Sequence, residues 1–398
     1  MGMTCLVSIH GIGFQQPPRD GRAGYADPLH TNLHNADLGR VVLGDDPHRN
    51  DVLGPVYVQS SWHGVREAGL KRLDEPLFRN DAAQVNVAHV ALVYADLVDP
   101  GPRLGSTLDT LAQTALSFDH YVHPLAAVRT IVADLAAMIS SQGPQGTNEP
   151  PSLRPREDIP DDQHAYFHLL HDILRAHRPQ AGQPTDGPLA VLRALEDDVA
   201  DYVCRNDLRE RIRGFVQQAL CRLADRTDVD TIVVNSHSQG TVVAFDVLAR
   251  SAPPKVHALV TAGSPLRKYV DLFAWGERAG LFHELMQRDR WCWLNAYDPR
   301  DPVADPLRPP RRWRLGDDPA PPPGQPTLFR IIDPSKPLTE TQDCPVIDHQ
   351  VDNVGHSVGS GLRAHDYWDN TTDFIPRLIT LLEQLTPTRV RQSPHERA

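Results

Sequence analysis

The segment 229-VDTIVVNSHSQGT-241 decides the fold class of this chain. Its first part, Val229–Asn235, is apolar and rich in β-branched residues, which is typical of a strand buried on both faces. Its last residue opens a helical pattern over Thr241–Arg250. A buried strand that leads directly into a helix is the repeating unit of α/β proteins, so we expect a parallel sheet.

Similar patterns extend on both sides of this segment. We expect further strands at Thr4–Ile9, Val56–Ser60, Val85–Leu97, Val256–Thr261, Trp291–Asn295 and Thr327–Ile332. Helical patterns cover Leu104–Ser141, Asp162–Ala176, Leu189–Ala224 and Asp366–Leu385. Because strands alternate with helices, the sequence predicts an α/β protein with a mostly parallel central sheet and helices on both faces.

The pattern divides the chain into four parts. Residues 1–100 form the first part of the core, and residues 226–386 form the second. Between them, residues 101–225 are expected to be a helical insertion, or cap, that ends in a lead-in helix. Residues 387–398 are expected to be a flexible tail.

Composition excludes several classes of protein. The chain has 398 residues, of which 40% are apolar, and this is too many for a disordered chain; its 36 prolines exclude a coiled coil. The net charge is 40 − 51 = −11, which argues against a nucleic-acid partner. No apolar run reaches the roughly 18 residues of a membrane span, and no signal peptide is recognisable. We therefore expect a cytoplasmic protein, with its 5 scattered cysteines reduced.

The turn after the strand carries the strongest chemical signal. Ser236, Ser238 and Gly240 form a Ser-x-Ser-x-Gly pattern between the predicted strand and helix. This is the arrangement of a nucleophile elbow, in which a sharp turn exposes the central serine above the sheet. We predict Ser238 as a nucleophile, with the backbone N–H of Gln239 at the positive end of the helix binding an oxyanion. An ordinary serine in a strand–helix loop is the alternative.

A second motif follows the first strand, where His10-Gly11-Ile12-Gly13 ends the apolar run. Glycines allow backbone amides to approach a substrate closely. The residue after the His-Gly pair, Ile12, is therefore predicted to donate the second N–H of the oxyanion hole, beside that of Gln239. A tight glycine turn without a catalytic role is the alternative.

An acidic residue and a histidine should follow the nucleophile in the chain. Three aspartates, Asp298, Asp301 and Asp305, come just after the strand at Trp291–Asn295. We select Asp301 to hold the histidine, because the other two are better explained as turn formers beside proline.

Three late histidines are candidates for the base. We select His365, which comes directly before the predicted last helix, with His356 as the alternative and His349 also late enough. Asp348, His349 and Asp352 could instead be metal ligands, but their spacing does not support a metal site. We expect no metal and no organic cofactor.

With these residues, the chain resembles the serine esterases and lipases of the α/β-hydrolase superfamily. More narrowly, it resembles the DDHD-domain intracellular phospholipases A1, in which the second Asp of the acid loop serves the triad. The similar stretches are His10–Gly13, Val58–His63, Val93–Tyr94, Gly240–Leu248, Asp298–Ala304 and His365–Asp373. Two departures are Ser236, where that family has Gly, and His365, which lies one residue nearer the Tyr-Trp pair.

The resemblance implies a hydrolase that cleaves lipid esters, by way of an acyl-enzyme on Ser238 with His365 and Asp301. A hydrolase of small esters or thioesters, or a catalytically silent scaffold used for binding, are the alternatives. Arg311–Arg314 could contact a membrane surface transiently, although we favour a solvated surface loop as the explanation of this basic stretch. The sequence does not indicate an oligomeric state.

Overall fold

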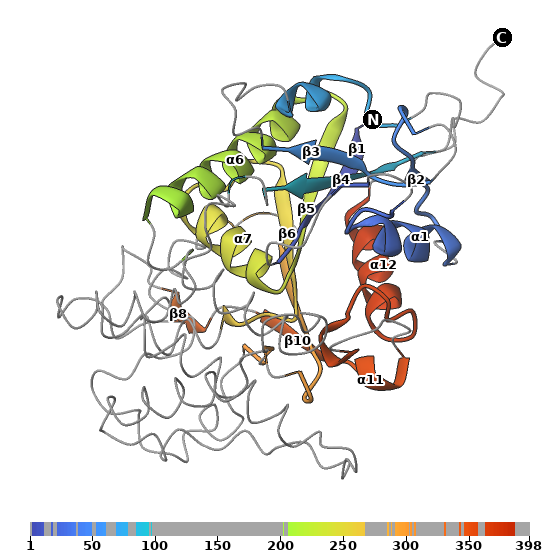
Figure 1. Cartoon of the computed structure of the whole chain (residues 1–398), viewed down its shortest axis with the longest axis vertical. Coiled ribbons are helices and arrows are strands. Elements are labelled where there is room, and N and C mark those ends of the chain that lie inside the picture. The colour runs from blue at the N-terminus through green and yellow to red at the C-terminus, as the bar shows by residue number, and fades with distance from the viewer. Residues whose placement is uncertain are drawn as a thin grey trace, which may run out of the picture.

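A parallel β-sheet of eight strands forms the centre of the protein (Figure 1). The computed structural model describes residues 2–11, 17–18, 22–36, 39–49, 53–60, 69–78, 85–94, 97, 202, 206–266, 285, 288, 291–301, 303–304, 306–307, 330–331, 342–343, 346–356 and 363–386. The sheet order is β10-β7-β6-β5-β1-β4-β2, and β3 also pairs with β4. Every one of these pairings is parallel, which confirms the α/β class.

The strands of this sheet come from both ends of the described chain. They are β1 (Met3–Ile9), β2 (Leu43–Gly44), β3 (Val56–Gln59), β4 (Val87–Val93), β5 (Val229–His237), β6 (Val256–Ala262), β7 (Cys292–Tyr297) and β10 (Val346–Gln350). A separate antiparallel pair consists of β8 (Arg330–Ile331) and β9 (Gln342–Asp343).

Helices cover both faces of the sheet (Figure 1). On one face lie α6 (Asn206–Asp225) and α7 (Gln239–Arg250), and on the other lie α1 (Asp27–Asn35) and α12 (Phe374–Leu385). The short elements are η1 (Leu70–Asp74), α11 (Asn353–His356) and η6 (Arg363–His365).

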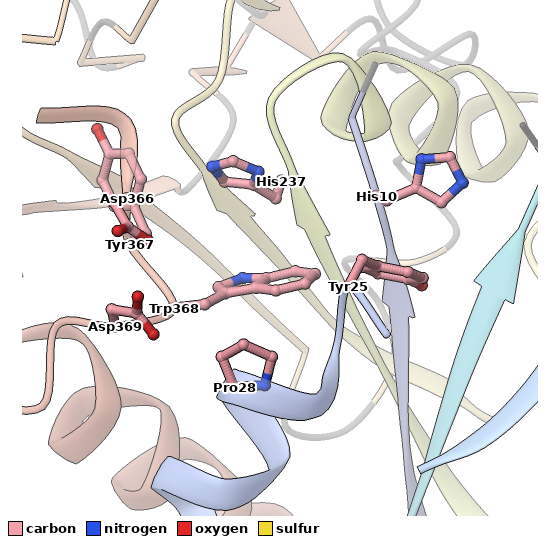
Figure 2. Close-up of a pocket in the computed structure, with 8 residues that line it drawn as sticks. All are labelled: His10, Tyr25, Pro28, His237, Asp366, Tyr367, Trp368 and Asp369. Carbon is pink, nitrogen blue, oxygen red and sulfur yellow. The ribbon is translucent and has the colours of Figure 1, made fainter. Parts of the chain in front are cut away.

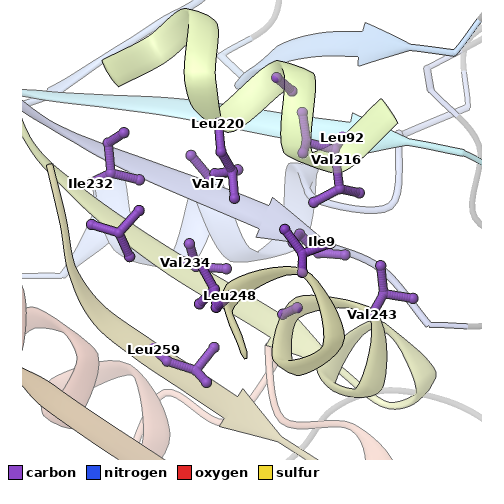
Figure 3. Packing of buried hydrophobic residues seen from close by; sticks show 14 of the residues in the cluster. Val7, Ile9, Leu92, Val216, Leu220, Ile232, Val234, Val243, Leu248 and Leu259 are labelled. Carbon is purple, nitrogen blue, oxygen red and sulfur yellow. The ribbon is translucent and has the colours of Figure 1, made fainter. Parts of the chain in front are cut away.

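The strand β5 shows why its central residues, Ile232, Val233 and Val234, are all apolar. Ile232 and Val234 pack toward α6 and α7, whereas Val233 belongs to the core on the α1 and α12 side. Figure 3 shows Val234 packed among the residues of the first core, close to Leu248 of α7. A strand buried on both faces needs apolar residues at every position.

The predicted strands agree with the structure to within a few residues, but several elements differ, among them the short strands β2 and β9, the helix α1, the edge strand β10 and the start of the last helix. α1 and β10 were not predicted, because α1 begins in a Pro-rich stretch and β10, VIDHQ, has polar residues at the sheet edge. The last helix begins at Phe374 rather than Asp366. Its expected first turns are replaced by a turn in which Asn370 Oδ1 accepts hydrogen bonds from the backbone N–H of Thr372 and Asp373.

Much of the expected cap, residues 101–201 and 203–205, and the expected tail, residues 387–398, lie outside the described residues. The described end of the predicted lead-in helix is α6, which packs on the sheet. No helix within the described ranges is long and apolar enough to cross a membrane.

Candidate active site

Ser238 occupies a strained turn between β5 and α7. Its backbone has φ 54° and ψ −132°, and among the described residues it is the one non-glycine residue with a positive φ. Such a conformation costs about 1–3 kcal/mol and persists where surrounding contacts enforce it. Here the Ser238 N–H donates to the Ala262 carbonyl (2.9 Å), and the Thr241 N–H donates to the Ser238 carbonyl (2.9 Å).

Small residues allow this turn to pack against the end of β1. A Cβ at Gly240 would collide with the backbone carbonyl oxygens of Ile9 and His10. A Cβ at Gly11 would lie 2.6 Å from the Cβ of Ser238, so the loop after β1 touches the predicted nucleophile. At the other small position, the Ser236 hydroxyl is buried and donates to the Val260 carbonyl (2.8 Å). This bond explains how a serine is accommodated there.

Asp301, which is buried, and His365, which is partly buried, form an acid–base pair. The His365 Nδ1–H donates to Asp301 Oδ2 over 2.8 Å, and the Tyr367 hydroxyl donates to the same oxygen over 2.8 Å. The Val303 N–H donates to Asp301 Oδ1 (2.9 Å), and the aspartate is 1% exposed. Burial acts to raise the pKa of Asp301, but His365 and the hydrogen bonds outweigh it and lower the pKa. Asp301 is therefore a carboxylate that orients the imidazole.

The second ring nitrogen of His365 is not used in the pair with Asp301. Nε2 is buried and makes no hydrogen bond within the described part of the chain, including to Ser238. Gly263, with φ 63°, allows the ring to approach the end of β6, since a Cβ there would lie 2.7 Å from His365 Cε1. Ala262, the residue before Gly263, accepts the hydrogen bond from the Ser238 N–H. The end of β6 therefore holds the serine turn and the imidazole side by side.

His237 was not singled out from the sequence, although it lies within the elbow motif. Its Nε2–H donates to the backbone carbonyl of His365 (2.9 Å), and the two rings are 4.6 Å apart between centroids. Burial, and then the nearby His365, lower the pKa of His237 to about 3. The neutral ring thus connects the turn of Ser238 to the segment that carries His365.

Tyr367 was quoted only as part of a similar motif, and its contacts explain its position. Besides donating to Asp301, its hydroxyl accepts the backbone N–H of Asp298 (2.8 Å). The side chain is fully buried. It therefore ties the acid loop to the segment after His365.

His10 holds the loop of the predicted oxyanion hole. Its Nδ1–H donates to the Gly11 carbonyl (2.6 Å), while Nε2 accepts the Tyr94 N–H (3.3 Å). The ring stacks on that of Tyr94 at 4.1 Å, and burial lowers the pKa of His10 to about 4. Ile12 lies outside the described residues, whereas Gln239 is the first residue of α7 and is buried.

The other candidate acids have different surroundings. Asp298 is fully buried and forms an ion pair with Arg300 (2.9 Å), and it accepts the Asn353 N–H (2.7 Å). These contacts stabilise the turn rather than a histidine. Asp305 lies outside the described residues.

The other candidate bases do not reach Asp301. His349 lies in β10 and its Nε2–H donates to the Asp373 carbonyl (3.2 Å), whereas His356 is exposed at the end of α11. Of the three histidines, the structure brings His365 to the aspartate.

The residues of the metal alternative are engaged elsewhere. Asp348 Oδ1 accepts hydrogen bonds from the Asn295 side chain and the Leu307 N–H, and Asp352 pairs with Arg300. Across the described ranges, no three His, Cys, Asp or Glu side chains converge as metal ligands would. The basic stretch Arg311–Arg314 lies outside the described residues.

Comparisons with known proteins add no relative. No family model matches the chain, and no curated protein or solved structure is significantly similar to it. The fold and the site by themselves define an α/β protein. A strained serine lies at the end of a central strand, next to an Asp–His pair.

Proposed function

We propose that this protein is a serine hydrolase of the α/β-hydrolase type that cleaves carboxylic esters. One observation carries the proposal. The Asp301–His365 pair lies beside the strained turn of Ser238, and His365 Nε2 has no hydrogen-bond partner among the described residues. A nucleophile, a base and an oriented acid are the set of groups that acyl transfer needs.

In the proposed mechanism, His365 Nε2 takes the proton of the Ser238 hydroxyl as its oxygen attacks the ester carbonyl carbon. The new O⁻ is held by the N–H of Gln239 and by that of Ile12 in the loop after Gly11. His365 then gives the proton to the leaving alcohol. A water molecule, activated by the same imidazole, hydrolyses the acyl-enzyme and restores Ser238.

Asp301 contributes by holding the imidazole rather than by accepting the proton. Because its pKa is lowered, it stays charged and stabilises the imidazolium that forms during attack. Tyr367, which donates to the same carboxylate oxygen, holds that oxygen in position.

Lipid esters are the proposed substrates, on the basis of the motifs shared with the phospholipases A1. An enzyme for small esters or thioesters would use the same three residues, so chain-length preference separates these two. The proposed chemistry requires no metal or organic cofactor, since each proton transfer uses a side chain of this protein.

The test is labelling with a fluorophosphonate probe, which reacts with activated serines. We expect the wild type to be labelled, Ser238→Ala not to be labelled, and the control Ser236→Ala to be labelled. Ser236 is the matched control because its hydroxyl is bound to the Val260 carbonyl. The proposal would be overturned if Ser238→Ala were labelled. It would also be overturned if the wild type and both variants were folded and none of them were labelled. Turnover of p-nitrophenyl esters of graded length then tests the lipid preference: rates should rise toward long chains.

A further inference from the structure

A small pocket adjoins the three segments of the proposed site (Figure 2). Its volume is about 190 Å³, which is smaller than the roughly 300–1,000 Å³ that holds a whole drug-sized ligand. Three of its lining residues are His10, His237 and Asp366. In the chain they lie next to the loop after β1, the strained serine and the predicted base. A pocket of this size and position suits one group of a larger substrate.

The pocket lies close to the predicted base. His237 and Tyr367 both line it, and the centroids of their rings are 4.6 Å and 6.1 Å from that of His365. In the proposed mechanism the leaving alcohol takes its proton from this imidazole, so the alcohol must lie within hydrogen-bonding distance of it. The pocket is therefore placed to receive the alcohol part of the ester.

Trp368 brings a buried hydrogen-bond donor to the pocket. The residue is 8% exposed, and its indole N–H makes no hydrogen bond within the part of the chain that the structure describes. Figure 2 shows the indole nitrogen on the ring edge toward His237, within the group of pocket residues. Because a buried N–H without a partner is unfavourable, a ligand oxygen that accepts this bond would be favoured.

His237 brings an acceptor from the neighbouring wall. Its Nε2 carries the proton, since the carbonyl oxygen of His365 can only accept a hydrogen bond. Burial, and then His365, lower the pKa of His237 to about 3, so the ring is neutral at pH 7 and Nδ1 keeps its lone pair. Nδ1 makes no hydrogen bond with the described residues. The ring centroids of His237 and Trp368 are 5.5 Å apart, so one small group can contact both side chains.

A hydroxyl is the group that satisfies this donor and this acceptor together. It accepts one hydrogen bond and donates another through the same oxygen atom, whereas an ether or carbonyl oxygen cannot donate and an ammonium group cannot accept. The carbon atoms beside it would contact aromatic rings, because Tyr25 also lines the pocket, with its ring 5.7 Å from that of Trp368. A short alcohol chain that ends in a hydroxyl matches both features.

We propose that this pocket binds a hydroxyl group on the alcohol part of the substrate, which accepts the indole N–H of Trp368 and donates to Nδ1 of His237. The inference rests on the proposed function and deepens it, because it names the ester. The substrate is an ester of a diol or polyol that keeps a hydroxyl close to the scissile bond. Trp368 is then a residue that determines specificity, in addition to the residues that carry out the reaction.

The kinetic test uses three esters of octanoic acid at pH 8. The 2-hydroxyethyl ester carries the hydroxyl, the propyl ester has the same shape without it, and the 2-methoxyethyl ester can accept a hydrogen bond but not donate one. We expect kcat/KM to favour the 2-hydroxyethyl over the propyl ester by about tenfold, or about 1.4 kcal/mol, with the 2-methoxyethyl ester between them. This comparison is made on the wild type and does not depend on the folding of any variant.

A pair of tryptophan variants then assigns the preference to the pocket. Trp368→Phe removes the donor and should lower the ratio of the 2-hydroxyethyl to the propyl ester to about threefold or less. Trp291→Phe is the matched control and should keep the ratio. Trp291 directly precedes β7, whose first residue pairs with the start of β6, so it lies at the strand end away from the site.

A spectroscopic test examines the pocket without turnover. The indole N–H resonance of Trp368 is assigned by its loss in Trp368→Phe, and it is followed in Ser238→Ala as each ester is added. The 2-hydroxyethyl ester should move this resonance downfield, as a new hydrogen bond does, and the propyl ester should not. Glycerol monooctanoate, tested in the same way and as a substrate, distinguishes a glycerolipid from a simple diol ester as the source of the hydroxyl.

The two tests separate failure of the pocket from failure of the enzyme. If the 2-hydroxyethyl and propyl esters are hydrolysed with equal kcat/KM and the indole resonance responds equally to both, the pocket inference is wrong and the hydrolase stands. If the 2-hydroxyethyl ester alone moves the resonance but the wild type cleaves no ester, the hydroxyl site stands and the proposed hydrolase function falls.

Discussion

Asp301 and Asp369 are carboxylates in neighbouring parts of the molecule, and their pKa values are shifted in opposite directions. Asp301 is almost completely buried, yet its pKa is lowered, whereas the half-buried Asp369 has its pKa raised to about 6. The difference lies in their partners: Asp301 accepts bonds from His365, Tyr367 and the Val303 N–H, and Asp369 lies next to another carboxylate. Burial alone therefore does not set the charge of an acidic side chain here.

The two arrangements suit different tasks. A carboxylate with three donors stays ionised and holds one imidazole in a single orientation. Asp369, partly buried beside a second carboxylate, keeps its proton to a higher pH, because ionising it there is unfavourable. The predictions below test each half of this comparison, beginning with the largest expected effect.

The largest effect on catalysis is expected at Asp301, the carboxylate that accepts three hydrogen bonds. Asp301→Asn should lower kcat by about 10³- to 10⁴-fold, because an amide cannot hold His365 in the right tautomer. Asp298→Asn is the control in the same loop; it loses the Arg300 ion pair and should lose stability, with activity per folded molecule within tenfold. Steady-state kinetics with a thermal melt measures both. Equal losses of kcat in the two variants would mean that Asp301 acts only through folding.

The close approach of the loop after β1 to the nucleophile predicts the next effect. Gly11→Ala should lower kcat/KM by about 10²-fold, because its Cβ would lie 2.6 Å from that of Ser238 and displace the serine. Gly214→Ala in α6 is the control: nothing lies within 4 Å of its added Cβ, and it should stabilise the helix by about 1 kcal/mol. An active Gly11→Ala would show that the serine tolerates displacement.

Tyr367→Phe tests whether the hydrogen bond from the Tyr367 hydroxyl helps to lower the pKa of Asp301. Loss of the hydroxyl leaves the Asp298 N–H without its acceptor, so the free energy of unfolding should fall by about 1–3 kcal/mol. The pKa of Asp301 should rise, because the carboxylate loses a donor, and kcat should be about tenfold lower. NMR titration of the Asp301 carboxyl group measures the first effect; a stability loss with an unmoved pKa of Asp301 and an unchanged kcat would leave Tyr367 a purely structural role.

The smallest effect is expected at the carboxylate pair. Because the pKa of Asp369 is raised in the folded protein, its ionisation destabilises the fold as pH rises from its ordinary value through about 6. Asp369→Asn should therefore increase stability at pH 8 by about 1 kcal/mol, a figure reduced for solvent screening of a half-exposed group. At pH 4.5, where the acid is mostly protonated, the gain should be much smaller. Urea denaturation at the two pH values measures this, and an equal gain at both would contradict the raised pKa.

The residues along the chain predicted the sheet and the candidate groups of the proposed site. A run such as Val229–Asn235 has one stable use, a strand covered on both sides, and a Ser-x-Ser-x-Gly turn after it leaves room for a strained serine. Asp301 was selected because it follows a predicted strand, and His365 because it directly precedes the predicted last helix, both in the chain order that this chemistry uses. These are local signals, and a single sequence carries them.

Only the tertiary structure decided which groups meet and with what charge. The bond between Asp301 and His365 joins residues from separate segments, and so do those of His237 and Tyr367, which the sequence did not mark. The edge strand β10 and the helix α1 were missed, because polar residues at a sheet edge and a Pro-rich helix start resemble loops. Acidity depends on the distance to partners and on burial, and both arise only when distant segments pack. For that reason Asp301 and Asp369 look alike in the sequence and differ in the folded protein.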